Sequence, residues 1–156
     1  MRYWGVVLLA LWVIPAVAED KKPVDQVVLW RGDAAITKAE ELLRQKKFSE
    51  SLDILDKIVA RNIRNADAHV DSAIAWYYLG NMDKADASLK NALAIDRGHM
   101  GAYVMAGLVS LKKEDRNQAE YYLNALRVAC QGDTCLEYIT LAHALREYKE
   151  KDGGFF

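Results

Sequence analysis

The chain has 156 residues, of which 52% are hydrophobic and 28% charged, and its formal net charge is −1. This length suits a single domain, and the composition is that of a globular rather than a disordered protein. The basic residues are scattered, as at Lys46, Lys47, Lys112 and Lys113. They form no continuous basic stripe of the kind that binds phosphate groups, so nucleic acid is not an expected partner.

Residues 1–18 have the pattern of a secretory signal peptide. Arg2 precedes an apolar run over residues 6–14, Pro15 follows, and Ala16-Val17-Ala18 is a small–x–small cleavage pattern. The apolar run is shorter than the roughly 20 residues that a transmembrane helix needs. We expect cleavage after Ala18 and export to the bacterial periplasm, with an uncleaved N-terminal anchor as the alternative.

Residues 19–31 form an N-terminal arm ahead of the repeats. The stretch from Val24 to Trp30 is too rich in apolar residues for a free linker. We expect it to pack on the first repeat as a short helix or an extended arm. The alternative is an exposed anchor for another protein.

A 34-residue repeat then runs three times, over residues 32–65, 66–99 and 100–133. Such a period is typical of a helix–turn–helix solenoid, whose units stack because one unit cannot bury its apolar face alone. Apolar residues recur at three- and four-residue steps, which predicts two helices in each repeat. The equivalent small residues, which permit close helix contact, are Ala39/Ala73/Gly107 and Ser51/Ala85/Ala119.

Residues 134–151 are predicted to form a capping helix. Thr134 and Glu137 have the spacing of a capping box, in which each side chain accepts a backbone N–H at the start of a helix. A terminal helix with one polar face gives a repeat stack the solubility it needs. The predicted apolar face consists of Leu136, Ile139, Ala142 and Leu145. The tail, residues 152–156, is expected to be flexible.

Cys130 and Cys135 are the only cysteines. Export places them in an oxidising compartment, and Gly132 lets the chain reverse between them. We expect a disulfide that fixes the capping helix. The alternative is a redox-active pair, although four residues separate these cysteines and the reactive dithiol motif has two.

The sequence carries no pattern of a catalytic or metal site. His69, His99 and His143 are dispersed, and none has a second ligand at zinc-binding spacing. Neither a nucleophile constellation nor a glycine-rich phosphate loop is discernible. We expect a protein that is not an enzyme and that uses no cofactor or metal.

The three repeats resemble the tetratricopeptide repeat (TPR) family. The second repeat carries the resemblance best, from Trp76 to Ala85 and from Ala92 to Asp96, and the small-residue positions stay in register across all three units. The proline that usually ends a family unit is replaced by Ile63, Arg97 and Gln131. The resemblance implies an all-α superhelix of three repeats followed by the capping helix.

In this family the first helices line a concave groove that binds a peptide or helix of a partner. The resemblance therefore implies groove residues here: Ile36, Glu40, Leu43, Arg44, Val70, Asp71, Ile74, Tyr77, Tyr78, Val104, Met105, Leu108, Leu111 and Lys112. Tyrosine and methionine suit such contacts because one is rigid and amphipathic and the other adapts its shape. Only Arg44 and Lys112 are cationic, so a clamp for a terminal carboxylate is not expected.

These features predict a non-catalytic binding module that recognises another envelope protein and assists assembly of an envelope complex. The alternative is a structural subunit or homo-oligomeric scaffold with a permanently filled groove. The arm, the terminal helix or a second copy are the candidate fillings.

Overall fold

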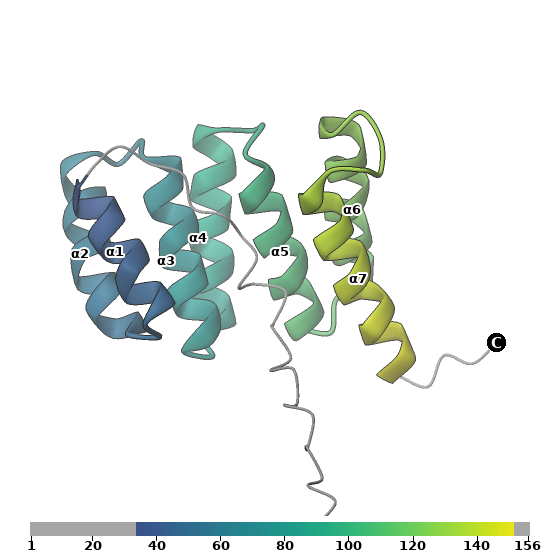
Figure 1. Cartoon of the computed structure of the whole chain (residues 1–156), viewed down its shortest axis with the longest axis horizontal. Helices are drawn as coiled ribbons and strands as arrows, with labels where there is room; N and C mark the ends of the chain where they lie inside the picture. The colour runs from purple at the N-terminus through teal and green to yellow at the C-terminus, as the bar shows by residue number, and fades with distance from the viewer. Residues whose placement is uncertain (1–33, 152–156) are drawn as a thin grey trace, which may run out of the picture.

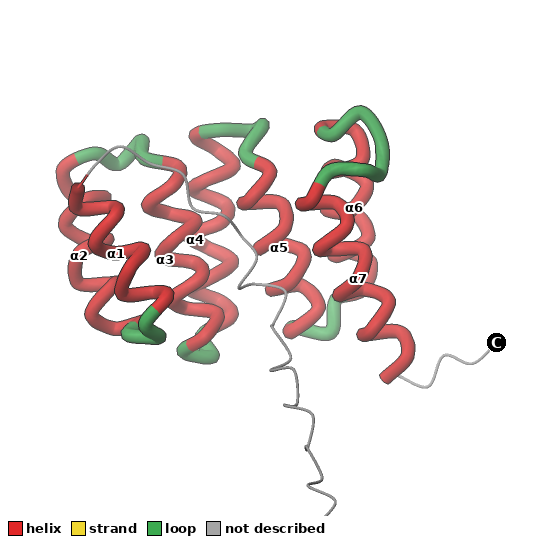
Figure 2. The backbone as a smooth tube through the Cα atoms, viewed as in Figure 1, coloured by secondary structure: helices red, strands yellow, loops and turns green. Residues whose placement is uncertain are grey.

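The computed structural model describes residues 34–151, which form a row of α-helices along the long axis of the molecule (Figure 1). This part of the chain contains no strand (Figure 2). The helices are α1 (Ala34–Arg44), α2 (Phe48–Arg61), α3 (Ala66–Tyr78), α4 (Met82–Ile95), α5 (Met100–Lys112), α6 (Arg116–Ala129) and α7 (Leu136–Lys151). The predicted all-α helical-repeat fold is confirmed, with one helix pair in each predicted repeat.

The predicted signal peptide (1–18), the arm (19–31) and the tail (152–156) lie outside the described residues. Their roles therefore stay predictions. Within the described part, no helix combines the length and apolar character needed to cross a membrane.

The helices form two layers. Each odd-numbered helix packs against the even-numbered helix of its own repeat, and α1, α3, α5 and α7 also contact one another in turn. The odd-numbered helices lie closer together than the even-numbered ones, which makes their layer the inner side of the superhelix.

Small residues allow the two helices of a repeat to approach closely. Ser51 on α2 donates its hydroxyl to the carbonyl oxygen of Ala39 on α1 at 2.9 Å, and both residues are fully buried. Ala73 and Ala85 occupy the equivalent places in the second repeat and are also fully buried. A larger side chain at these positions would push the helices apart, because protein interiors are close-packed.

The turns within the repeats share one backbone conformation. Lys46, Gly80 and Glu114 are spaced 34 residues apart and have φ values of 61°, 79° and 61°. After two of these turns, Asn81 and Asp115 cap the next helix by accepting the N–H groups of the third residue along, at 3.1 and 3.0 Å. The sequence period therefore repeats in the backbone as well as in the core.

His99 links the second repeat to the third. Its Nδ1 accepts the N–H of Ala102 at 3.2 Å, which caps α5, and its Nε2 lies 2.8 Å from Asp67 Oδ1 on α3. Since Nδ1 is the acceptor, Nε2 carries the proton and donates it to Asp67. This pair fixes the boundary between repeats near Arg97, where the family's usual proline is missing.

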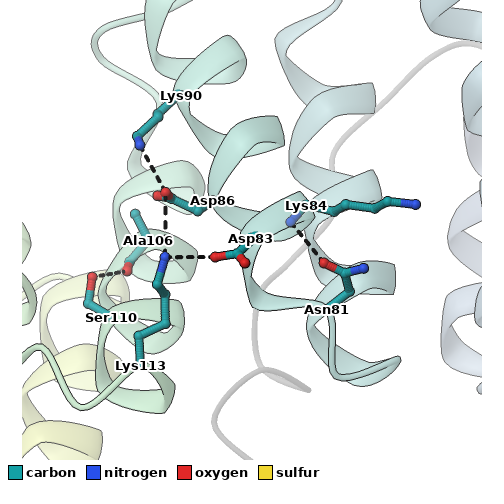
Figure 3. A network of polar contacts seen from close by, with 8 residues as sticks. All are labelled: Asn81, Asp83, Lys84, Asp86, Lys90, Ala106, Ser110 and Lys113. Atoms are coloured by element: carbon teal, nitrogen blue, oxygen red, sulfur yellow. Dashed lines mark hydrogen bonds and ion pairs between the residues drawn. The ribbon is translucent and has the colours of Figure 1, made fainter.

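A second set of polar contacts joins α4 to α5 near the solvent (Figure 3). Lys113 Nζ lies 3.1 Å from Asp83 Oδ1 and 3.9 Å from Asp86 Oδ2, while Lys90 Nζ lies 2.9 Å from the same oxygen of Asp86. Exposed ion pairs contribute at most about 1 kcal/mol each. Their main effect is to select the register between the two helices.

The start of α7 differs from the prediction. The helix begins at Leu136, and the N–H of Tyr138 donates to Cys135 Sγ at 3.4 Å. Cys135 therefore takes the capping position predicted for Thr134, so the predicted Thr134–Glu137 capping box is wrong by one residue. The reason is that the bond to Cys130 holds the chain at Cys135 where it enters the helix.

The buried face of α7 was also predicted only in part. Leu145 is buried as expected, but Leu136 and Ile139 are 50% and 51% exposed, and Leu141 is fully buried instead. Gly107 on α5 explains this rotation of α7. A Cβ atom at Gly107 would clash with the side chain of Leu141, so the missing side chain leaves the space that Leu141 fills.

Gly107→Ala should therefore lower the melting temperature and loosen α7. Overpacking costs about 1–3 kcal/mol, which outweighs the roughly 1 kcal/mol that Ala gains over Gly within a helix. Leu141→Ala should also destabilise the chain, by leaving a cavity of side-chain size. The two changes together should destabilise it less than their sum, because the new methyl group occupies part of that cavity. Additive losses in thermal unfolding would contradict the contact.

Candidate binding face on the odd-numbered helices

The candidate site consists of predicted groove residues on α1 and α3, and part of this set packs against α2, since Ile36 shares an apolar cluster with Leu55 and Ile58. Ala39 marks the side of α1 that faces α2, because its carbonyl accepts the Ser51 hydroxyl. An α-helix turns by about 100° per residue, so the side chain of Glu40 points about 100° away from the direction in which Ala39 faces α2. The equivalent residue of α3, Ile74, lies at the same angle from Ala73. We call the fourteen groove residues predicted above, taken together, the inner face.

Most of these predicted residues are buried. Tyr77 and Tyr78 are half-buried, and only Arg44 and Lys112 are exposed. The buried members are Ile36, Glu40, Leu43, Val70, Asp71, Ile74, Val104, Met105, Leu108 and Leu111. They belong to the core of the folded chain rather than to an exposed floor, and their role in binding stays a prediction.

On α5 a described helix accounts for much of this burial. α7 packs along α5, with Leu141 against Gly107. Val104 and Leu108 lie one turn apart on α5 and share one apolar cluster with Leu141 and Leu145. The capping helix thus takes space that a ligand of the third repeat would need, which shifts the candidate site toward α1 and α3.

Aromatic side chains gather at the end of α3. Tyr78 stacks on Phe48 with ring centroids 4.7 Å apart, and Tyr77 meets Tyr78 edge-on at 5.6 Å. Burial raises the pKa of the Tyr77 hydroxyl above its ordinary value. Such an apolar surface with hydroxyl groups at its edge is of the type that contacts peptides. The sequence prediction included the two tyrosines but missed Phe48, which is the first residue of α2.

Two carboxyl groups lie deep in the inner face. Glu40 is only 5% exposed, Asp71 is fully buried, and Glu40 Oε1 has no hydrogen-bond partner among the described residues. Ile36 and Ala68 pack in one apolar cluster. Glu40 lies one turn beyond Ile36 on α1, and Asp71 lies one turn beyond Ala68 on α3. The two helices that carry these carboxyl groups contact one another.

The two predicted cations do not form a site with these acids. Arg44 donates to Glu41 Oε2 from Nε at 3.0 Å and from Nη2 at 2.7 Å. Hydrogen bonds from Gln45 and then from Arg44 lower the pKa of the Glu41 carboxyl. Arg44 thus forms an ion pair with Glu41 on the solvent side of α1. Lys112 lies two helices away, at the end of α5.

The described residues hold no group of three or more His, Cys, Asp or Glu side chains arranged to bind a metal. Cys130 and Cys135 are bonded, with their Cα atoms 5.9 Å apart. This separation lies within the roughly 4.4–6.8 Å that a disulfide spans. The bond ties the end of α6 to the start of α7.

The fold and this layered geometry define a class, the all-α helical-repeat superhelix. Among solved structures, the first TPR of Spaghetti (RPAP3) bound to the HSP90 peptide SRMEEVD matches with a TM-score of 0.67 and 17% identity, over 77% of this chain and 91% of that one. The second TPR domain of human RPAP3 in complex with the HSP70 peptide SGPTIEEVD matches with a TM-score of 0.64 and 13% identity, over 72% of this chain and 92% of that one. The Sgt2 TPR domain from Aspergillus fumigatus matches with a TM-score of 0.66 and 18% identity, over 77% of this chain and 80% of that one. The chain has the tetratricopeptide-repeat fold.

No family model and no curated protein matches the sequence. The fold is thus shared with TPR domains at a sequence identity too low to transfer their ligands.

Removing the disulfide by Cys130→Ala and Cys135→Ala together should lower the free energy of unfolding by about 2 kcal/mol, on the chain-entropy estimate for so short a loop. The loss should be concentrated in α7, which amide hydrogen exchange can resolve. Uniformly faster exchange over all helices would contradict a local role. Gln131→Ala, in the same loop, is the matched control and should leave α7 protected.

Proposed function

We propose that this chain is a non-catalytic protein-interaction module of the cell envelope. In this proposal it binds an extended peptide or a helix of another exported protein on the inner face, and so assists assembly of an envelope complex. The observation that carries the proposal is the inner face itself, where apolar residues of α1 and α3 lie beside the half-buried Tyr77 and Tyr78.

The solved TPR domains support a peptide as the kind of ligand that this chain binds. Two of them are complexes with short peptides, SRMEEVD and SGPTIEEVD. A superhelix of this type presents the same side of its first helices in every unit, so one extended peptide can contact several repeats. The signal-like residues 1–18 and the Cys130–Cys135 bond support an exported location.

The charge of the inner face differs from that needed for those particular peptides. Both end in EEVD, which carries three acidic side chains and a terminal carboxylate close together. Here the inner face buries Glu40 and Asp71, and its cation Arg44 already pairs with Glu41. Like charges close together repel, so the proposed partner presents an apolar segment with a basic rather than an acidic group.

The peptide SRMEEVD should not bind this chain measurably at concentrations up to about 1 mM, which corresponds to about −4 kcal/mol of binding free energy. Fluorescence anisotropy of the labelled peptide tests this, with a TPR domain that binds the peptide as the positive control. Saturable binding that Lys112→Glu abolishes would show instead that the inner face works as a clamp for carboxylates.

Tyr77→Ala should reduce capture of the native partner at least about tenfold, because aromatic residues supply much of the energy of such interfaces. Affinity capture from the native envelope fraction, followed by quantitative mass spectrometry, measures the effect. Tyr77 is only half-buried, so circular dichroism should show unchanged helicity. Leu108 is left unchanged in this test because it belongs to the core, and its loss would destabilise the fold.

The control variant is Lys57→Glu with Arg64→Glu, two exposed residues outside the inner face. It should capture the same partner as the unmodified chain. Equal capture by the inner-face variant and the control would contradict the proposed site.

A further inference from the structure

We propose that Met100, Cys130 and Cys135 form a binding site for a single copper(I) ion once the disulfide between the two cysteines is reduced. Two thiolates and one thioether then supply three soft sulfur ligands at one edge of the superhelix. The inference goes beyond the proposed function and does not depend on it, because these three residues are not members of the inner face.

The three sulfur atoms meet where α5, α6 and α7 come together. Cys130 caps the end of α6, Cys135 directly precedes α7, and Met100 is the first residue of α5. Cys130 Sγ is bonded to Cys135 and lies 3.9 Å from Met100 Sδ. The loop between α6 and α7 lies at the same edge of the molecule as the start of α5 (Figure 1). Spacing along the chain does not reveal this cluster, because 30 residues separate Met100 from Cys130.

Stacking of the repeats does not account for these sulfur atoms. The positions equivalent to Cys130 in the first two repeats are Asn62 and Asp96, and both of these polar residues cap the end of a helix. The position equivalent to Met100 in the second repeat is Ala66. Met100 is 37% exposed, so burial in the core does not require it either. Sulfur therefore replaces a polar residue and a small residue at two positions that contact each other.

The separation of the sulfur atoms suits trigonal coordination of a metal. A metal–thiolate bond is about 2.3 Å long, the value known for zinc, so three sulfur atoms around one metal lie about 4.0 Å apart. Cys130 Sγ and Met100 Sδ already lie 3.9 Å apart. The Cα atoms of Cys130 and Cys135 are 5.9 Å apart, and rotation about the Cα–Cβ bonds moves the freed sulfur atoms to the required spacing.

The set of ligands favours copper(I) over zinc. Soft thiolate and thioether ligands suit copper(I), whereas a structural zinc site takes four protein ligands. Within residues 34–151, no third His, Cys, Asp or Glu joins the two cysteines in a metal-binding group. Two thiolates and the thioether of Met100 therefore leave zinc one ligand short of its usual four, while they complete a three-coordinate site for copper(I).

The step that prepares the site is a thiol–disulfide exchange. A dithiol reductant attacks one sulfur of the Cys130–Cys135 bond, and its second thiol resolves the mixed disulfide. Two electrons and two protons pass to the cysteines, and the reductant leaves as a disulfide. Both cysteines are partly exposed, so a reductant reaches the bond. Copper(I) then displaces the two thiol protons.

The start of α7 favours the thiolate form of Cys135. The backbone N–H of Tyr138 donates to Cys135 Sγ at 3.4 Å. The N-terminal end of a helix carries a partial positive charge, which stabilises a negative charge placed there. Loss of the thiol proton to copper(I) is therefore easier at this position than at a solvent-exposed cysteine elsewhere.

Titration of the full chain with copper(I) tests the site. The chain is reduced with a phosphine, separated from it without oxygen, and titrated with copper(I) in competition with the coloured chelator bicinchoninate. The reduced chain should hold one copper(I) ion, and the disulfide form should hold none. Met100→Leu should weaken the affinity at least about tenfold, because loss of even an outer-shell partner of a metal costs about 10–100-fold. Failure of the reduced chain to bind, or equal affinity in Met100→Leu, would overturn the proposal.

Met82→Leu is the matched control. It makes the same exchange at the first residue of α4 and should leave the copper(I) affinity unchanged. Copper(I) should also raise the melting temperature of the reduced chain, because a ligand that binds the folded state stabilises it. The melting temperature of the disulfide form should not change, and an equal rise in both forms would contradict a site built from the cysteines.

X-ray absorption at the copper edge identifies the ligands directly. The unmodified reduced chain should show three sulfur neighbours around copper(I), and Met100→Leu at saturating copper(I) should show two. The same number of sulfur neighbours in both chains would overturn the role of Met100. Copper(I) shared between two chains, seen as a dimer that forms only with the metal, would overturn the single-chain site.

Discussion

Close contact between small residues at the crossing of the two helices of each repeat is the constraint on which this structure depends. The Ser51 hydroxyl reaches the carbonyl oxygen of Ala39 only because neither residue holds the backbones apart. The same approach recurs at Ala73 and Ala85. It fixes the distance between the two layers and so brings the odd-numbered helices together in one row. The position of every residue on the inner face follows from this spacing.

Polar contacts then decide how consecutive repeats are placed. The proline that rigidly ends a unit in the TPR family is missing, and His99 takes over part of its role by capping α5 while it donates to Asp67 on α3. Lys113 adds contacts with α4 on the solvent side. The histidine contact is directional and partly buried, so it specifies the boundary more strongly than the exposed ion pairs do.

The sequence was sufficient to predict the helical repeats and the proximity of Cys130 to Cys135, because each depends on spacing along the chain. The orientation of α7 was not predictable in this way. Its sequence carries two apolar stripes, one through Leu136 and Ile139 and one through Leu141 and Leu145. The choice between them depends on the space left by Gly107, thirty-four residues earlier. Periodicity shows that a stripe exists, but the neighbouring helix decides which stripe is buried.

The same distinction applies to the binding face. Resemblance and periodicity identified which side of the odd-numbered helices carries Ile36, Glu40 and Ile74, but not that these side chains lie in the core. Burial changes the meaning of Glu40 in particular. On an open groove it would be one solvated acid among many, whereas at 5% exposure its carboxyl group is removed from water, which is costly for a polar group. On the proposed binding face an acidic peptide would bring a further carboxylate close to buried acidic residues, which is unfavourable because like charges repel.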